Sequence, residues 1–323
     1  MELIWAKRTG EEVAVLPWDA DIECGGSNTF EVSIPVSSWD GEIVPGSLIY
    51  VPWTEYGGIV GEIETSNNPP AVLVKGYTWR GLLSKKIIQP KKGQDYYTIS
   101  GNSADCIATL LETFYGDALF QAGRDNTVTI KNYQFNRYTD LLSGINAMLK
   151  TTGNRLSLKY LGDAGHVTLN IGAIENHTAA INYDDTDALR VTSRAVYNGV
   201  NHLKCLGKGE LAARQVVHLY TDAAGNVVPK KVLTGRDEIA EVYDNTSAES
   251  RDELKKGGLE RLNEVKSASY IDASADSLQG DMEIGDVVTG TDPVTGMSAR
   301  IPIGSKVLSI AGGVPAIAYR LEG

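Results

Sequence analysis

Side chains that could act as nucleophiles, bases or metal ligands are scattered along this sequence and form no known catalytic motif. There is no Gly-x-Ser-x-Gly elbow, no Ser-x-x-Lys followed by Lys-Thr-Gly, and no cysteine-protease signature. His202 and His218 are the pair that two neighbouring strands could bring together. Two histidines without a third ligand are weak support for zinc, because zinc sites use three or four protein ligands. The four histidines, which we interpret as core or surface residues, are His166, His177, His202 and His218.

Acidic residues cluster twice, as Asp-Asp-Thr-Asp at positions 184–187 and as Asp-Ala-Asp-Ile-Glu at positions 19–23, where we expect a loop. Neither segment has the spacing of a calcium-binding loop. A glycosidase needs two carboxylates across a cleft, and such a pair can come from any part of a fold. Turn and cap roles explain these aspartates, so we assign no catalytic and no metal-ligating residue.

Signatures of phosphate and cofactor binding are also missing from the sequence. Gly207-Lys208-Gly209 follows an expected strand, but it opens no helix and lacks the third glycine of a dinucleotide-binding turn. No Walker A sequence occurs. We therefore expect no cofactor, assign no cofactor-binding residue, and predict that the protein is not an enzyme.

All five tryptophans lie in the first 79 residues. Exposed indole rings can stack on sugars, which would indicate a carbohydrate-binding protein. Indole rings also fill the core of a small barrel or a subunit interface, and we favour that interpretation. The N-terminal part is therefore the best candidate for a contact surface. The tryptophans are Trp5, Trp18, Trp39, Trp53 and Trp79.

Composition excludes several classes of protein. The 323 residues carry 30 Lys and Arg against 41 Asp and Glu, a formal net charge of −11, which argues against a protein built to grip nucleic acid. Hydrophobic residues make up 42% and charged residues 22%, as in a globular chain of two or three domains. No apolar run is long enough to span a membrane, and residues 1–8 do not resemble a signal peptide. Three separated cysteines predict buried thiols rather than disulfides.

The elements that would position these residues are mostly strands, so the predicted fold class is α+β and β-rich. Residues 1–90 alternate apolar and polar side chains in short runs between glycines and prolines, and we predict a first small β-barrel there. Residues 91–175 are predicted to form a small α+β domain. Its two amphipathic helices are expected over Ala104–Tyr115 and Thr139–Lys150.

Residues 176–323 are predicted to form a second β-barrel that carries an inserted strand and helix subdomain at about residues 211–270. Thr246-Ser247-Ala248-Glu249 fits a capping box, which predicts a helix from there to about Lys266. The two strand-rich ends flank the α+β domain and also carry the excess negative charge. The net charge is −6 for residues 1–90, 0 for 91–175 and −5 for 176–323.

The two ends also resemble each other in sequence. Gly46 and Gly285 each open a strand, another glycine follows eleven residues later in both, and the offset between the copies is 239 residues. Residues 70–74 and 315–319, both beginning Pro-Ala, match at an offset of 245. Short patterns recur by chance, and the alternative interpretation is a duplicated barrel.

The whole arrangement resembles the hub proteins of bacteriophage tails, found at the tail tip or baseplate and also encoded in prophages. It also resembles the N-terminal region of siphophage tail-associated tip proteins. Residues 77–88 are similar to the family's segment leaving the first barrel, although Arg80-Gly81 reverses the usual Gly-Arg order. Residues 103–105 and 140–142 match the helices of the middle domain. Residues 197–209 and 285–296 resemble the strand entering the second barrel and its closing hairpin.

This resemblance implies a structural virion protein that adapts the sixfold tail tube to a threefold tail tip. Such hubs are homotrimers in which two barrels per subunit form a pseudo-sixfold ring, and DNA passes through the central channel without sequence-specific binding. The implied neighbours are the tail tube or distal tail protein, the tape-measure protein, and a tail fibre, tip or lytic protein. The implied location is the phage tail, after synthesis in the cytoplasm of the bacterial host.

Two other functions remain open from the sequence. The tryptophan cluster is compatible with a receptor-binding or carbohydrate-binding tail protein. The abundance of Asp and Glu is compatible with a glycosidase, although that abundance is generic. The net negative charge of the two ends predicts an acidic surface or pore lining that repels phosphate.

Overall fold

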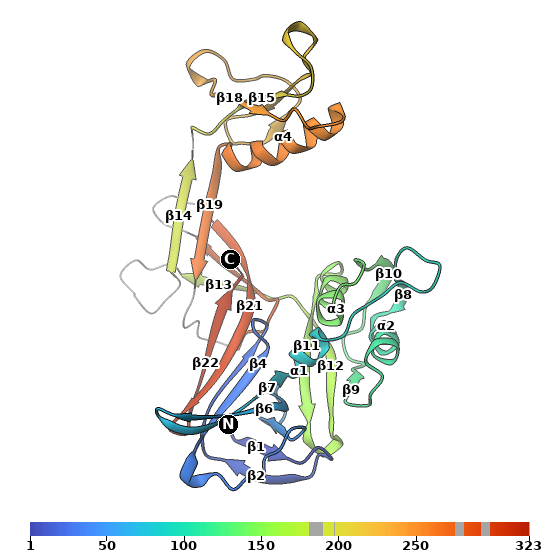
Figure 1. Ribbon diagram of the computed structural model, residues 1–323, viewed down its shortest axis with the longest axis vertical. Helices are drawn as coiled ribbons and strands as arrows, with labels where there is room; N and C mark the ends of the chain where they lie inside the picture. Colours follow the sequence, from blue (N-terminus) through green and yellow to red (C-terminus); the bar gives the residue numbers. More distant parts are fainter. Residues whose placement is uncertain (181–189, 197, 275–280, 292–297, 323) are drawn as a thin grey trace. The chain divides into compact units, whose positions relative to one another are not determined.

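The computed structural model describes residues 1–180, 190–196, 198–274, 281–291 and 298–322. The chain separates into two compact units, whose elements Figure 1 shows. Unit 1 comprises residues 1–190, 273–291 and 299–323, and unit 2 comprises residues 191–272 and 292–298. Residues 91–175 fall within unit 1, and the three-domain division predicted from the sequence stays a prediction.

One sheet of eleven strands contains strands from both ends of the chain, in the order β13-β20-β21-β3-β4-β7-β6-β5-β1-β2, with β22 also paired to β21. The prediction of a β-rich α+β fold is confirmed. Strands from both predicted barrel regions pair in this sheet, and the described strands include no closed barrel. The strands are β1 (Leu3–Ala6), β2 (Glu12–Leu16), β3 (Asp19–Cys24), β4 (Thr29–Pro35), β5 (Leu48–Tyr50), β6 (Gly57–Asn67), β7 (Pro70–Thr78), β13 (Asn176–Ala180), β20 (Val287–Thr291), β21 (Ser298–Ala311) and β22 (Val314–Leu321).

The two ends share a sheet because β3 pairs with β21. The pairing is antiparallel and places Cys24 opposite Lys306. The backbones come close near Gly25, where a Cβ atom would lie 2.1 Å from the carbonyl oxygen of Gly304. Gly25 has a φ of +101°, which residues with a side chain rarely adopt. Local sequence patterns carry no information about such a distant pairing, which explains why the sequence predicted separate barrels.

The acidic segment expected to be a loop is the strand β3, so that prediction was wrong. Ala20, Ile22 and Cys24 are buried in the core, while Asp19 and Asp21 alternate with them on the exposed side. Aspartate is uncommon in strands, but β3 is hydrogen-bonded to β4 on one side and β21 on the other. Pairing on both edges and the period-two burial outweigh the low propensity.

The middle of the chain packs short helices against small sheets. Asn102 caps α2 (Ser103–Leu110), which continues as a wide turn over Leu111–Tyr115, and Asp140 caps α3 (Leu141–Lys150). Both helices lie where the sequence predicted them. Their apolar sides share one buried cluster with α1 (Trp79–Ser84) and β11. The strands of this part are β8 (Thr98–Asn102), β9 (Phe120–Ala122), β10 (Thr129–Gln134), β11 (Asn154–Leu161) and β12 (His166–Ala173).

The turns before β5 and β20 are built alike, as the glycine spacing suggested. In the first turn, Ser47 N donates to Val44 O and Gly46 N donates to Val60 O. In the second turn, Asp286 N donates to Glu283 O and Gly285 N donates to Ile303 O. Gly46 and Gly285 both have a φ of +95°. The second sequence pair, Gly57 and Gly296, cannot be compared because residue 296 lies outside the described residues.

The hairpins that follow these turns also match. The pairing of β6 with β7 shifts register between Val60 and Glu62, and the pairing of β21 with β22 shifts between Ile303 and Ser305. A glycine, Gly61 or Gly304, lies within each shift. We call β5-β6-β7 and β20-β21-β22 the two repeats. Their shared turns and bulges favour the duplication over a chance match of sequence.

Unit 2 is a small sheet with one helix. The strand order is β17-β16-β15-β18, and β14 and β19 form a separate two-stranded sheet. The helix α4 (Arg251–Val265) ends as predicted, but its cap is Ser250, which accepts a hydrogen bond from Glu253 N, and not Thr246. Among the described residues, no helix is long and apolar enough to cross a membrane. The strands are β14 (Arg190–Val196), β15 (His202–Leu206), β16 (Val216–Thr221), β17 (Val227–Val228), β18 (Ala240–Asp244) and β19 (Ala268–Ser274).

Candidate functional site

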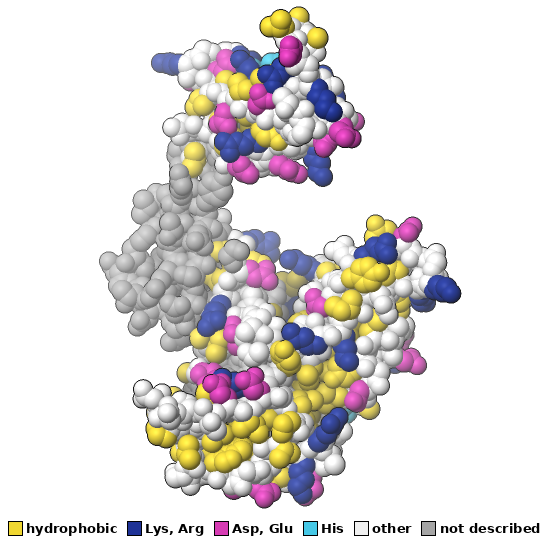
Figure 2. Space-filling view, in the orientation of Figure 1, with side chains coloured by type: hydrophobic (Ala, Val, Ile, Leu, Met, Phe, Trp, Pro, Cys, Tyr) yellow, Lys and Arg dark blue, Asp and Glu magenta, His cyan; other side chains and the backbone are white. Residues whose placement is uncertain are grey.

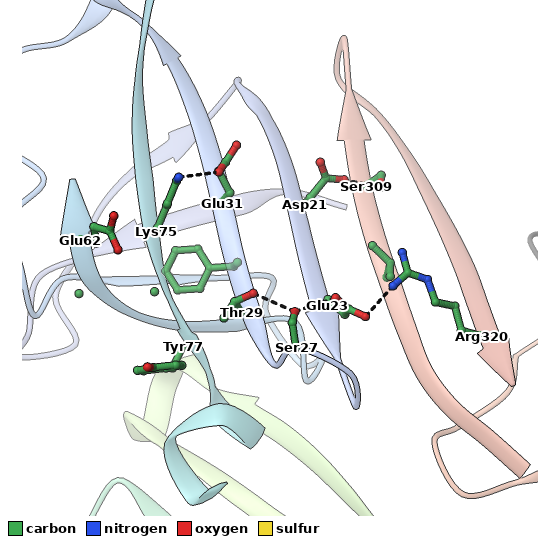
Figure 3. Close-up of a pocket in the computed structure, with 14 residues that line it drawn as sticks. Asp21, Glu23, Ser27, Thr29, Glu31, Glu62, Lys75, Tyr77, Ser309 and Arg320 are labelled. Atoms are coloured by element: carbon green, nitrogen blue, oxygen red, sulfur yellow. Dashed lines mark hydrogen bonds and ion pairs between the residues drawn. The ribbon is translucent and has the colours of Figure 1, made fainter. Parts of the chain in front are cut away.

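The outward face of the large sheet carries a concave polar surface, which we call the polar face (Figure 3). It extends across β22, β21, β3, β4, β7 and β6, and therefore across both repeats. The period of two that buries Ile22 and Val32 in the core turns their neighbours Asp21 and Glu31 outward. The labelled residues in Figure 3 are Asp21, Glu23, Ser27, Thr29, Glu31, Glu62, Lys75, Tyr77, Ser309 and Arg320.

Acidic side chains outnumber basic ones on the polar face. The two basic residues each pair with an acid: Lys75 Nζ lies 3.3 Å from a carboxylate oxygen of Glu31, and Arg320 Nη1 lies 2.8 Å from one of Glu23. Hydrogen bonds to Glu64 and Glu31 raise the pKa of Lys75. The residues that line the face thus include more carboxylates than basic groups. The face is suited to repel phosphate rather than to bind it.

Lys75 and Arg320 occupy equivalent places in the two repeats. In the strand register, Lys75 lies opposite Glu62 just beyond the bulge of the β6–β7 hairpin. Arg320 lies opposite Ser305 just beyond the bulge of the β21–β22 hairpin. The basic residues of the polar face thus occupy repeated positions rather than forming one unique group of side chains. Serine hydroxyls donate to carboxylates on it, as Ser27 Oγ does to Glu23 Oε2 at 2.6 Å, but the residues that line it include no histidine and no cysteine.

A buried ionic cluster joins the loop between β5 and β6 to α1 and β21. Arg80 Nε donates to Glu55 Oε2 at 2.6 Å, and Lys306 Nζ lies 2.7 Å from Glu55 Oε1 and 2.9 Å from Glu283 Oε2. Arg80 Nη2 also donates to the carbonyl of Leu156 in β11 at 3.1 Å. Arg80, Glu55 and Lys306 are at most 6% exposed. The cluster carries two positive and two negative groups, so its charges balance inside the protein.

The charges in this cluster stabilise one another against the cost of burial. Burial by itself raises the pKa of Glu55, but Arg80 and Lys306 outweigh it and hold the pKa below its usual value. Burial lowers the pKa of Lys306, but Glu55 and Glu283 outweigh it and raise the pKa. Burial raises the pKa of the nearby Cys24 thiol, so this cysteine is protonated and unreactive.

A second buried carboxylate, Asp286, holds the loop before β20 against the middle of the chain. Its oxygens accept hydrogen bonds from Arg155 Nε at 2.6 Å, from Glu175 N at 2.9 Å and from Glu283 N at 3.0 Å. His177 Nε2 lies 3.3 Å away. Burial raises the pKa of Asp286, but the hydrogen bonds from Glu175 and Arg155 outweigh it and lower the pKa.

These lowered pKa values predict that acid destabilises unit 1. A carboxylate whose pKa is lower in the folded state adds stability above its unfolded value of about 4, and that stability is lost as the pH falls through the folded value. We expect the urea midpoint of unit 1, followed by tryptophan fluorescence, to fall between about pH 5 and about pH 3. Asp286→Asn removes one titrating group and should flatten this dependence. Equal slopes for the variant and the natural chain would contradict the assignment.

The predicted histidine pair forms in unit 2. His202 and His218 lie on the neighbouring strands β15 and β16, with His202 Nε2 2.8 Å from His218 Nδ1. His202 Nδ1 is 2.6 Å from Glu238 Oε1, and Lys231 holds the other oxygen of that carboxylate. These contacts use both ring nitrogens of His202 for hydrogen bonds. Among the described residues, no group of three or more His, Cys, Asp or Glu could hold a metal ion.

The tryptophans divide between core and surface. Trp5 and Trp79 are buried. Trp18 and Trp39 are partly buried and pack against the apolar cluster formed mostly by strands of the large sheet. Trp53 alone is largely exposed, at 58%. The interpretation as core residues therefore describes four of them, and the chain presents no row of exposed indole rings for sugars.

The remaining sequence candidates form no site in the described structure. Residues 184–187 lie outside the described residues. Gly209 has a φ of +100° and packs against the backbone of Ala213 and Arg214, as a tight turn requires. All three cysteines are free and buried. The sequence predicted an acidic surface on the two ends but not the residues of the polar face, although the alternation of acidic and apolar residues in 19–24 was a signal for them.

No protein-family model matches the chain, and a comparison with curated protein sequences gives no match. Three solved structures cover nearly all of it. The tail protein from Neisseria meningitidis MC58 is 13% identical, with a TM-score of 0.47, and the alignment covers 100% of this chain and 97% of that one. The 43 kDa tail protein of prophage MuSo2 from Shewanella oneidensis is 11% identical, with a TM-score of 0.48 and coverage of 100% and 98%.

The third structure is the prophage tail protein gp18 from Listeria monocytogenes EGD-e, at 12% identity, a TM-score of 0.49 and coverage of 99% and 94%. All three are tail proteins, which is the class that the sequence resembles. With TM-scores below 0.5 and identities of 11–13%, no function follows from these matches.

Proposed function

We propose that this chain is a structural, non-enzymatic subunit of a phage or prophage tail hub. It would assemble as a homotrimer in the tail tip or baseplate of the virion. One side of the ring would contact the tail tube or distal tail protein and the tape-measure protein. The other side would receive a fibre, tip or lytic protein.

The observation that carries this proposal is the pair of repeats that share one sheet under a common polar face. Each chain has two repeats with the same turn, bulge and outward basic residue. Three copies around an axis would present six similar hairpins, so a threefold assembly would match a sixfold partner. An enzyme or a monomeric binding module has no need of such a repeat.

The polar face supports a channel role in the same assembly. A channel wall for DNA must let phosphates pass without holding them. Carboxylates on β3, β4 and β6 outnumber Lys75 and Arg320, so the face repels a polyanion at neutral pH. We infer that this face lines the channel of the trimer.

The assembled mass of the full chain tests the proposal. We expect light scattering or native mass spectrometry across a range of concentrations to show a species of three times the chain mass. The same protein should not retain double-stranded DNA at about 0.15 M salt, where basic channels bind it strongly. A chain that is monomeric at every concentration, or one that binds glycans as a monomer, would contradict the proposal.

The two alternatives from the sequence have less support. A carbohydrate-binding surface needs exposed aromatic rings, and Trp53 is the one tryptophan that is mostly exposed. A glycosidase needs a carboxylate pair with one raised pKa. On the polar face, Glu23 and Glu31 instead pair with basic residues.

A further inference from the structure

The two repeats differ at one edge. In the second repeat, β21 pairs with β22 on one side, and its residues 306–310 pair with β3 on the other side. In the first repeat, the equivalent stretch of β6, residues 63–67, pairs with β7. Among the described residues, no strand pairs with the other edge of this stretch.

Burial follows the same difference. The bulges align Val60 with Ile303, so Ile63, Thr65 and Asn67 correspond to Lys306, Leu308 and Ile310. Leu308 is 0% exposed and Ile310 is 7% exposed, because β3 and its core residues cover them. Ile63 is 36% exposed, and Thr65 and Asn67 are also exposed. A strand edge that is paired in one repeat and open in the other is a site for pairing with another strand.

The order of strands along the chain indicates which strand would cover it. The hairpin β3–β4 precedes the first repeat, and the strand pair β14–β19 precedes the second. β3, the first strand of the hairpin before the first repeat, covers the second repeat. Its counterpart, the first strand of the pair before the second repeat, is β14. Among the described residues, β14 pairs with β19 alone. The sequence of β14 includes Arg190 and Arg194, whereas Glu62 precedes the open edge of β6 and Glu64, which also pairs with Lys75, lies within it.

We propose that residues 63–67 of β6 pair antiparallel with β14 (residues 190–196) of a second copy of this chain. This contact repeats, between chains, the contact that β3 and β21 make within one chain. It joins different surfaces of the two copies, so it closes into a ring if the rotation between copies allows. The inference rests on the proposed homotrimer, because it names the surface through which that trimer forms.

The first test substitutes the edge without disturbing the core. Ile63→Lys combined with Thr65→Lys places two charges on exposed positions of the open edge, a device by which natural edge strands resist pairing. We expect the concentration for half-assembly to rise about tenfold or more, with folding unchanged by circular dichroism. The matched control is Val13→Lys with Val15→Lys, on the exposed side of the edge strand β2, which should assemble as the natural chain does.

The second test is hydrogen exchange of the natural chain above and below its assembly concentration. Peptides covering residues 63–67 and 190–196 should gain protection together on assembly, while the peptide covering 12–16 should not. If the chain forms trimers but the β6 variant assembles normally and residues 63–67 stay unprotected, this inference is wrong and the proposed function stands. If neither the natural chain nor any variant assembles, both are wrong.

Discussion

Arg80→Met is expected to destabilise unit 1 by about 3–5 kcal/mol, because it leaves Glu55 buried with an unbalanced charge. Arg80 is 1% exposed, and its guanidinium binds both Glu55 and the carbonyl of Leu156. Methionine preserves most of the side-chain volume, so the change tests the charge rather than a cavity. Urea unfolding followed by tryptophan fluorescence measures it, since all five tryptophans lie in unit 1.

Two further variants separate the charge effect from general damage. Arg80→Met combined with Glu55→Gln leaves Lys306 paired with Glu283, so the cluster is neutral again, and we expect it to be more stable than Arg80→Met alone. Arg320→Met removes an ion pair on the polar face whose arginine is 63% exposed, and it should cost about 1 kcal/mol or less. A loss for Arg320→Met as large as that for Arg80→Met would contradict the role of the buried cluster.

Trp79→Ala is the second change with a large expected cost, about 3–5 kcal/mol. Trp79 begins α1, is fully buried, and stacks on the ring of Tyr160 with centroids 5.0 Å apart. Its removal leaves a cavity where α1, β5 and β11 meet in one apolar cluster. The urea midpoint of unit 1 measures the loss.

Two variants serve as controls for this change. Trp79→Phe keeps the stacked ring, and Trp79 Nε1 has no hydrogen-bond partner among the described residues, so this variant should lose clearly less stability. Trp53→Ala removes the exposed tryptophan and should stay within about 0.5 kcal/mol of the natural chain. Equal losses for Trp79→Ala and Trp53→Ala would contradict the packing described here.

Both residues lie in the segment 77–88 that carries the resemblance to tail hubs. The reversed order Arg80-Gly81 has a structural reason. A Cβ atom at position 81 would lie 2.3 Å from the carbonyl oxygen of Asn28, so glycine is required where α1 passes the β3–β4 hairpin. The arginine before it reaches the buried Glu55. Arg80 and Gly81 therefore both serve the packing of this segment.

Local features of this chain could be predicted from its sequence. These features depend only on residues that are close in the sequence. They include the strand alternation in residues 30–36, the helices near 104–115 and 139–150, and the glycine turns at which strands begin or end. The matching turns at Gly46 and Gly285 were visible because a φ of +95° strongly favours glycine. The absence of a catalytic motif and the negative charge are likewise properties of the sequence itself.

Tertiary structure alone decided the rest, because it depends on contacts between distant residues. Nothing near residue 55 indicates that Glu55 meets both Arg80 and Lys306, and nothing near β3 indicates that it pairs with β21. That pairing places strands of both ends in one sheet and makes a strand of an acidic segment with low strand propensity. The polar face also depends on strand pairing, because the order β3-β4-β7-β6 is what brings carboxylates from β3, β4 and β6 onto one surface.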